Sequence, residues 1–133
     1  MKKILTAAFC AAMASPALAQ GWPTGYEGVI LQGFYWDSYS DSQWKNLEKQ
    51  APELGSYFSL LWVPQSGKCL EEHNVMGYTP YYYFDQNSSF GSEAELRSMI
   101  RAMHQNGVGV LADVVINHHN TSGWFSFPKE EYR

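Results

Sequence analysis

Four polar side chains interrupt or end a long apolar run near the C-terminal end of the sequence. Residues 107–119 read GVGVLADVVINHH, so Asp113 interrupts the run, and Asn117, His118 and His119 end it. Carboxylate, amide and imidazole groups can hold a metal ion, bind hydroxyl groups or transfer protons. An apolar run with such an ending is typical of a central parallel strand that delivers polar side chains to the rim of a site.

Each of these groups has its own chemistry. Asp113 is either a reactive acid or a structural carboxylate, and we favour the structural role because a carboxylate in an apolar run needs partners. Asn117, on the same face of a strand as Asp113, offers a hard amide oxygen that suits Ca²⁺ better than zinc. Ca²⁺ takes roughly six to eight oxygens, so the others must come from elsewhere. The adjacent His118 and His119 cannot both face one metal from a regular strand, so we expect one to bond a hydroxyl group and the other to face solvent.

A second candidate lies in the segment of residues 66–85, which is rich in Gly, Pro and Tyr. A loop of this length is usually functional or disordered, and its many aromatic residues argue against disorder. Tyr78 follows Gly77 in this segment. Its ring is either a stacking platform for a sugar or part of the packing of the loop over the domain, and spacing leaves both open.

The elements that position these groups follow from apolar periodicity. Apolar runs predict strands over residues 28–34, 57–63 and 108–116. A first helix places Trp44, Leu47 and Ala51 on one face. We expect Asp41 or Ser42 to cap this helix, and Pro52 to end or kink it.

The second helix carries a stronger start signal. Ser92 and Glu95 form a capping box, in which each side chain accepts a hydrogen bond from the other residue's backbone N–H. The apolar stripe that follows is helical in spacing and predicts a core face; it consists of Leu96, Met99, Ile100 and Met103. Gly107 is the expected residue just past the helix end.

The order strand, helix, strand, loop, helix, strand predicts a parallel α/β sheet. All three strands are apolar on both faces, as expected when helices cover them. A doubly wound sheet and a β/α barrel both fit this pattern. No Gly-x-Gly-x-x-Gly follows the first strand, so the usual dinucleotide-binding motif is missing. In both architectures, ligands bind at the carboxyl ends of the strands.

The first 19 residues are expected to be a signal peptide that is removed on export. A basic start, an apolar stretch over residues 4–14 and the pattern Ala17-Leu18-Ala19 predict cleavage before Gln20, and the stretch is too short to span a membrane. The rest carries 7 basic and 13 acidic residues, a net charge of −6 once Lys2 and Lys3 are removed. This balance argues against nucleic acid as a partner and favours a neutral polymer or a cation. Cys69 is the one cysteine left, so we expect a buried thiol without an intrachain disulfide.

Five motifs in order resemble the N-terminal part of a secreted alpha-amylase, the large glycoside hydrolase family that acts on alpha-glucans. They are LQGFYWD (31–37), LWVP (61–64), GYTP (77–80), FGS (90–92) and DVVINH (113–118). The last resembles the first signature region of that family. The resemblance implies a (β/α)₈ TIM barrel, of which residues 20–119 would form the first three β/α units and residues 120–133 would begin the small inserted domain.

The resemblance also implies a role for each candidate residue. Asn117 would ligate a structural Ca²⁺ between the barrel and the inserted domain. His118 would bond the glucose unit at the cleavage site, and Tyr78 would stack on it. Asp113 would be a structural carboxylate near the site. The implied substrate is a starch-like α-glucan, cleaved at internal α-1,4 bonds with retention.

The catalytic carboxylates of that family are not found among these motifs. A retaining enzyme needs two carboxylates about 5 Å apart, and a barrel needs about 250 residues. The sequence holds no Gly-x-Arg-x-Asp, so we expect an N-terminal fragment, truncated before the catalytic strands and inactive alone. A non-catalytic glucan-binding protein, a transglycosylase and an α-1,6-acting enzyme remain alternatives, and the sequence does not predict the oligomeric state.

Overall fold

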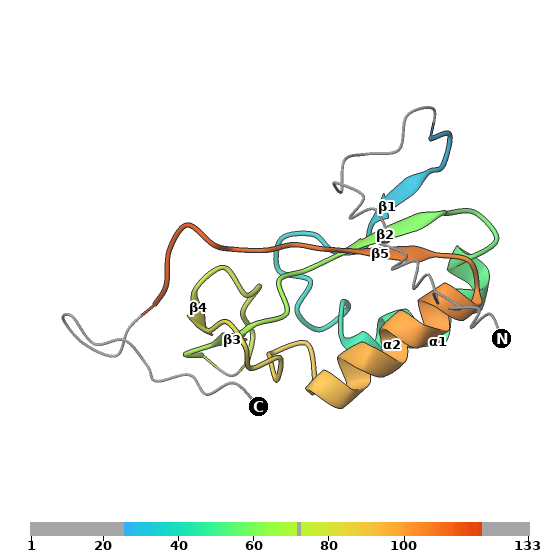
Figure 1. The fold of residues 1–133 in the computed structure, drawn as a ribbon. Coiled ribbons are helices and arrows are strands. Elements are labelled where there is room, and N and C mark those ends of the chain that lie inside the picture. The colour runs from blue at the N-terminus through green and yellow to red at the C-terminus, as the bar shows by residue number, and fades with distance from the viewer. Residues whose placement is uncertain (1–25, 72, 121–133) are drawn as a thin grey trace, which may run out of the picture.

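The computed structural model describes residues 26–71 and 73–120 (Figure 1). Its elements, in chain order, are β1 (Ile30–Gln32), α1 (Trp44–Leu54), β2 (Leu60–Val63), β3 (Lys68–Cys69), β4 (Pro80–Tyr82), α2 (Glu93–Gln105) and β5 (Gly109–Ala112). The predicted signal peptide (1–19) and residues 121–133 of the predicted inserted domain lie outside the described residues. Neither described helix is long and apolar enough to cross a membrane.

Strands β1, β2 and β5 form a parallel sheet in that spatial order, which is also their order in the chain. Both helices lie on the same face of this sheet, with α1 packed against α2 and α2 against β5 (Figure 1). Right-handed crossovers between strands that follow one another in sequence order place their helices on one face of the sheet. The described helices cover one face in this way, which fits the expected barrel.

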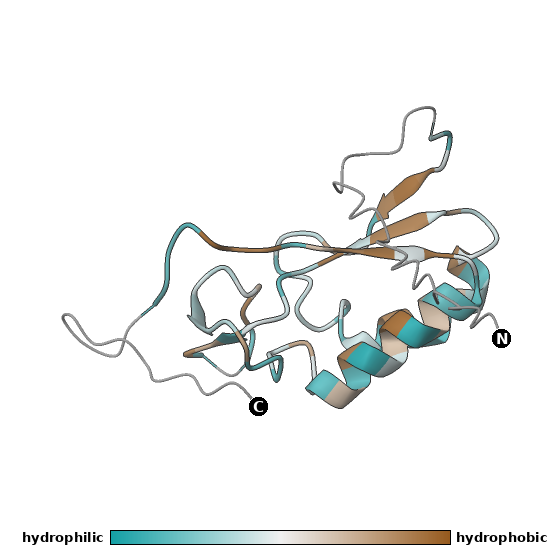
Figure 2. Cartoon of the chain, in the orientation of Figure 1, coloured by the Kyte–Doolittle hydropathy of each residue, from teal (hydrophilic) through white to brown (hydrophobic). Residues whose placement is uncertain are grey.

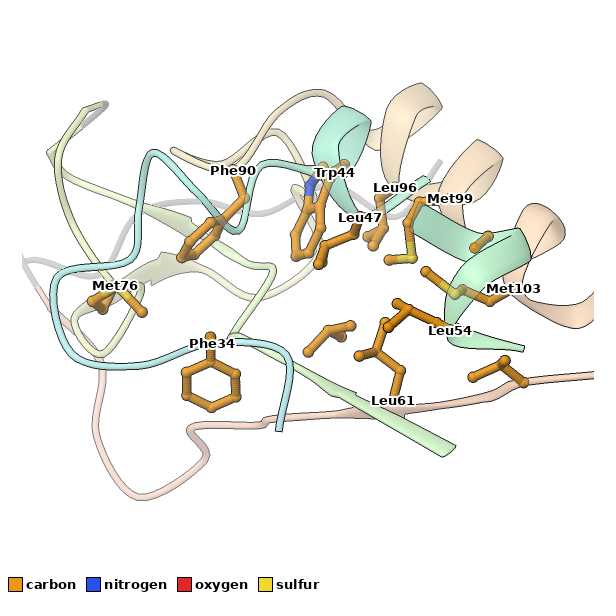
Figure 3. Close-up of a cluster of buried hydrophobic side chains, with 13 residues drawn as sticks. Phe34, Trp44, Leu47, Leu54, Leu61, Met76, Phe90, Leu96, Met99 and Met103 are labelled. Atoms are coloured by element: carbon orange, nitrogen blue, oxygen red, sulfur yellow. The ribbon is translucent and has the colours of Figure 1, made fainter. Parts of the chain in front are cut away.

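The hydrophobic core lies between the sheet and the two helices. In the sheet, Leu31 pairs with Leu61, and Leu61 with Val110, so three apolar side chains form a row on the helix side. The stripes of the helices pack toward this row, and Figure 3 shows most of their members around Leu61. The buried residues are Trp44, Leu47, Ala51 and Leu54 on α1, and Leu96, Met99 and Met103 on α2. Both predicted core faces are confirmed, with Ile100 only partly buried.

The two helix starts differ. The capping box of α2 is confirmed: the Ser92 hydroxyl accepts from the Glu95 N–H, and the Glu95 carboxylate from the Ser92 N–H. The predicted cap of α1 by Asp41 or Ser42 is wrong. The residue before α1 is Gln43, which makes no side-chain cap. Ser42 donates to the Gly33 carbonyl instead, 3.1 Å away.

A backbone carbonyl from a loop takes the place of a side-chain cap on α1. The N–H of Trp44, at the start of the helix, donates to the Phe90 carbonyl over 2.9 Å. The Asp41 carboxylate is occupied by the hydroxyl of Tyr35. At the other end, the helix continues past Pro52 to Leu54.

All three predicted strands are longer than the observed ones. β5 ends at Ala112 instead of Ile116 because its partner β2 ends at Val63. Pro64 has no N–H with which to extend the ladder, and the last bond runs from the Asp113 N–H to the Val63 carbonyl.

The start of the second predicted strand is also set by local hydrogen bonds. The N–H groups of Tyr57 and Phe58 turn back to the Leu54 carbonyl at the end of α1, so β2 begins at Leu60. The first strand is likewise shorter than expected, with β1 covering Ile30–Gln32. The segment of residues 66–85, expected to be a loop, contains the antiparallel pair β3 and β4. Cys69 on β3 is buried and unpaired, as expected, and burial raises its pKa.

The face of the sheet away from the helices is open in the described part of the chain. Ile30 of β1 and Trp62 of β2 are exposed there, although both strands are strongly hydrophobic (Figure 2). Val114 and Ile116, just past β5, are exposed as well. An apolar sheet face of this kind needs a cover of further protein.

Candidate functional site

The candidate residues come together beyond the carboxyl ends of the strands. Two hydrogen bonds hold the strand exits side by side: the Gly33 N–H donates to the Trp62 carbonyl over 2.8 Å, and the Asp113 N–H to the Val63 carbonyl over 3.2 Å. The segment of residues 66–85 returns to this same edge of the sheet. The parallel arrangement thus collects side chains from three connections.

Tyr78 makes hydrogen bonds with two of the other candidates. Its hydroxyl donates to the Asp113 carboxylate over 3.3 Å. The Nε2 of His118 lies 2.7 Å from the Tyr78 carbonyl oxygen. A carbonyl only accepts, so the imidazole must carry its proton on Nε2. The structure therefore joins three residues that are 35 and 40 positions apart in the sequence.

Burial raises the pKa of the Tyr78 hydroxyl, and the negative charge of Asp113 and the hydrogen bond to it raise it further. The hydroxyl consequently stays protonated and neutral at all pH values near 7, as a donor to Asp113. Asp113 is half-buried, less deeply than its place in an apolar run suggested, because the neighbouring face of the sheet is open. Its carboxylate accepts a hydrogen bond from Tyr78, and the structural role of Asp113 stays a prediction.

Gly77 determines how Tyr78 enters the site. Its φ is +90°, a conformation that side chains with a Cβ adopt at a cost. A Cβ at this position would lie 2.7 Å from the carbonyl oxygen of Gln65. Gln65 is itself buried, and its side chain accepts the N–H of Gly67. The backbone at Gly77 thus lies tightly against the carbonyl group of Gln65, directly before Tyr78.

Trp36 stacks on the ring of Tyr78 and was not among the sequence candidates. The two ring centroids are 6.3 Å apart and the rings are inclined by only 6°. Trp36 belongs to the connection that follows β1 and is exposed. In the sequence it stands within the aromatic run FYW, where spacing does not separate a surface ring from a core ring.

A second group of contacts holds the segment of residues 118–120 against β4 and the residue after it. The Tyr83 hydroxyl donates to the His118 carbonyl over 2.8 Å, and the Asn120 N–H donates to the Pro80 carbonyl over 2.7 Å. The ring of His119 packs against Tyr81 and Tyr83, with centroids 6.2 and 4.8 Å away. His118 is the exposed histidine, and His119 is half-buried. We expected the second histidine to face solvent. This is wrong for His119, because it is half-buried against two tyrosine rings.

Asn117 lies in a bend beyond β5, with its side chain exposed. Since the strand ends at Ala112, the prediction that Asp113 and Asn117 lie on one face of a strand is wrong. The amide is accessible to a hard cation, which fits the predicted role. However, residues 26–71 and 73–120 contain no group of three carboxylate, histidine or cysteine side chains that could hold a metal. Asn117 therefore fits as one ligand of a site whose other oxygens lie elsewhere.

Comparison with known proteins places this geometry in a family. Residues 64–131, more than half of the chain, match the family model of the alpha amylase catalytic domain. The chain belongs to the alpha-amylase family. It is 38% identical to probable alpha-amylase 2 of Arabidopsis thaliana over 68% of the chain. It is 33% and 36% identical to the glucan 1,4-alpha-maltotetraohydrolases of Stutzerimonas stutzeri and Roseateles saccharophilus, in each case over 90% of the chain.

This alpha-amylase family chain spans about a fifth to a quarter of the length of these curated relatives: 21%, 26% and 25%. Among solved structures, it is similar to alpha-amylase I of Eisenia fetida, with a TM-score of 0.60 and 24% identity over 72% of this chain and 19% of that one. A variant of that enzyme in complex with maltohexaose gives a TM-score of 0.56 over 71% of this chain and 18% of the other. These likenesses establish the fold, a β/α barrel, and the family is one of glycoside hydrolases.

Proposed function

We propose that this chain forms the first three β/α units of the barrel of an exported alpha-amylase, which hydrolyses internal α-1,4 bonds of starch-like glucans with retention. The observation that carries the proposal is the link from Tyr78 to both Asp113 and His118 at the carboxyl edge of the sheet. In a member of this family, such an arrangement supports a site for a glucose unit. Export follows from the signal pattern of residues 1–19.

The chemistry of the site suits a neutral sugar. The ring of Tyr78 offers a flat apolar surface to the C–H groups of a pyranose. The exposed imidazole of His118, with Nε2 engaged by the Tyr78 carbonyl, directs its Nδ1 to accept from a sugar hydroxyl. Asp113 holds the Tyr78 hydroxyl and so fixes the orientation of the platform. These residues bind and orient, and none of them is proposed to break the bond.

Bond cleavage requires groups outside the described residues. A retaining glycosidase uses two carboxylates about 5 Å apart, whereas Asp113 is already bonded to Tyr78. We therefore propose that residues 1–133 alone bind glucan weakly or not at all and do not hydrolyse it. Asn117 would contribute one oxygen to a structural Ca²⁺, with further ligands from the inserted domain that begins near residue 120. The ion would supply stability rather than chemistry.

Hydrolysis by the product of the complete gene tests the proposal. It should release reducing sugars from soluble starch, and the products should appear first as α-anomers when followed by NMR. Purified residues 20–133 should give no turnover under the same conditions. Inverted products, or no hydrolysis of any α-glucan, would contradict the proposal. Glucan binding without hydrolysis by the complete product would favour the alternative of a non-catalytic glucan-binding protein.

A further inference from the structure

We propose that Asn106 and Gly107, at the end of α2, form a latent deamidation site: the folded chain holds it closed, and unfolding of the helix end opens it to an irreversible change. The inference concerns the chemistry of the chain itself, so it goes beyond the proposed function and does not depend on it. It is carried by the pairing of these two residues, by the hydrogen bonds that hold both reacting groups and by the tight contact with the end of α1.

Deamidation needs an asparagine and an accessible backbone nitrogen directly after it. That nitrogen loses its proton and attacks the side-chain Cγ, a C–N bond forms, and ammonia leaves with the amide nitrogen. Water then opens the resulting succinimide ring at either carbonyl and leaves an aspartate or an isoaspartate. Overall, an amide and water become a carboxylic acid and ammonia. Glycine hinders the attack least, because it has no Cβ beside the nitrogen.

Asn106 is the one asparagine of the sequence that precedes a glycine. The other five are followed by Leu47, Val75, Ser88, His118 and Thr121. Each of those residues carries a Cβ that crowds the attacking nitrogen. Among the asparagines of this sequence, Asn106 is therefore the one that should react first when the chain is unfolded.

In the folded chain, hydrogen bonds hold the two reacting groups apart. The Nδ2 of Asn106 donates to the Ala102 carbonyl over 2.8 Å, so the carboxamide points back along the helix. The Gly107 N–H donates to the His104 carbonyl over 3.1 Å. Ring closure requires the carboxamide to turn toward the Gly107 nitrogen, and this nitrogen to give up its proton. Both hydrogen bonds must break before the reaction can begin.

The closed state depends on the last turn of α2, which forms a Schellman motif. Next to the bond made by Gly107, the Val108 N–H donates to the Met103 carbonyl over 2.9 Å. Gly107 has the positive φ that this motif requires, +77°. Met103 and Val108 are both buried in the core, so the turn opens only when this part of the core opens. The rate of deamidation is therefore set by how often the end of α2 unfolds.

Both products disturb the junction of the two helices with β5. A Cβ on Gly55, just past α1, would overlap the Asn106 carbonyl oxygen, so the two backbones are tightly packed. An isoaspartate routes the main chain through its own Cβ and adds a carbon atom there, shortly before Gly109 begins β5. An aspartate keeps the main chain but cannot donate to Ala102, and it places a negative charge at a helix C-terminus. Unfolding followed by modification thus removes molecules that could otherwise refold.

Peptide mapping by mass spectrometry on the product of the complete gene tests the proposal. One sample stays native and another is unfolded in guanidinium chloride, at the same pH and temperature. We expect aspartate and isoaspartate at position 106 to form at least about tenfold faster in the unfolded sample, because the helix end must otherwise open first. Position 106 should change before the other five asparagines. The rate should rise with pH, since the attacking nitrogen must lose its proton.

The recovery of native circular dichroism after dilution of the denaturant measures the consequence. The unmodified protein should lose recovery in proportion to the fraction modified at position 106. Asn106→Gln should keep its recovery, because the longer side chain closes a larger ring more slowly. Asn87→Gln is the matched control and should lose as much as the unmodified protein. Asn87 precedes Ser88 instead of glycine, and its amide is likewise held, by a 2.8 Å bond to the Asp85 carboxylate.

Three results would overturn the proposal. Equal rates at position 106 in native and unfolded protein would show that the fold gives no protection. Faster conversion of another of these asparagines would show that the site is elsewhere. Full recovery of chains modified at position 106 would show that the junction tolerates both products. The first two comparisons use the unmodified protein alone, so they decide even if Asn106→Gln folds poorly.

Discussion

At the scale of single residues, Tyr78 combines a binding surface with a structural hydrogen bond. Replacing it by Phe keeps the ring and removes the bond to Asp113. We expect Tyr78→Phe to lower glucan affinity severalfold at most, since a hydrogen bond contributes roughly 0.5–1.5 kcal/mol. Tyr78→Ala should lower it much more. Calorimetric titration with maltooligosaccharides measures both, and equal losses in the two variants would show that the ring makes no contact.

Asn117 is tested by the Ca²⁺ dependence of stability. We expect Asn117→Ala to lower the melting temperature of the complete gene product in the presence of Ca²⁺. With a chelator, the variant and the unmodified protein should melt together, because a lost ligand matters only when the ion is bound. The same loss with and without chelator would mean that Asn117 holds the fold by other contacts.

Residue types and order were enough to predict which side chains gather at the site, but not how they are joined. Tyr78 and His118 meet through a backbone carbonyl, which leaves no trace in side-chain spacing. The stacking of Trp36 on Tyr78 could not be predicted, since the two residues are 42 positions apart and only the folded chain brings their rings together. The type of a residue determines which chemistry it can perform, whereas the identity of its partner depends on tertiary contacts.

At the scale of elements, Gly77 is the position where the backbone most directly controls the site. Gly77→Ala combines a left-handed residue, which costs about 1–2 kcal/mol, with a clash against the Gln65 carbonyl. Gly107→Ala is the control, because Gly107 has a φ of +77° but no atom within 4 Å of its Cβ position. Both variants should be less stable in urea unfolding. Only Gly77→Ala should also lose glucan affinity, and intact affinity would show that the clash is relieved without moving Tyr78.

The start of α2 gives a pH-dependent prediction. Glu95 caps the helix and also bonds Lys45 over 2.7 Å. This bond is the main cause of the lowered pKa of Glu95 and of the raised pKa of Lys45. The pair therefore stabilises the fold between about pH 4.5 and 10.5, the ordinary values of the two groups. Its contribution is lost as pH falls through the lowered pKa of Glu95 or rises through the raised pKa of Lys45.

Glu95→Gln separates the two roles, because the amide oxygen still accepts the Ser92 N–H. Melting temperatures should show a small, salt-sensitive loss that is confined to this pH window, as expected for a largely exposed pair. Ser92→Ala should cost about 0.5–2 kcal/mol at every pH, since it removes the cap itself. A pH-independent loss in Glu95→Gln would contradict the ion-pair explanation.

Elements were predicted better than their ends. The α2 capping box and its apolar stripe are local signals, and both are confirmed. The end of β5 depends instead on where β2 stops, and the cap of α1 is displaced because Ser42 bonds a strand exit. These boundaries are decided by partners far away in the sequence.

At the scale of the whole molecule, the open face of the sheet leaves several large apolar side chains exposed to solvent. Ile30, Trp62, Val114 and Ile116 are all exposed in the described part of the chain. We expect residues 20–133 alone to bind a dye such as anilinonaphthalene sulfonate and to aggregate, as exposed apolar patches do. The product of the complete gene should bind no dye and should show blue-shifted tryptophan emission. A soluble, dye-free chain of residues 20–133 would show that this face is covered in another way.

The sequence order of the strands left a doubly wound sheet and a barrel open. An apolar run indicates that both faces of a strand are buried. It does not indicate whether helices or other strands cover each face. Both architectures place the helices of successive crossovers on one face, so the choice of the barrel rests on the similarity to solved structures.

The strictly sequential pairing of β1, β2 and β5 also bears on how the protein is made. Among the described strands, β2 joins β1 and β5 joins β2, so each joins a strand that has already left the ribosome. The sheet is therefore suited to growth during translation, one strand at a time from the N-terminus. Until the chain is finished, its newest edge and its open face are the surfaces that a chaperone would have to shield.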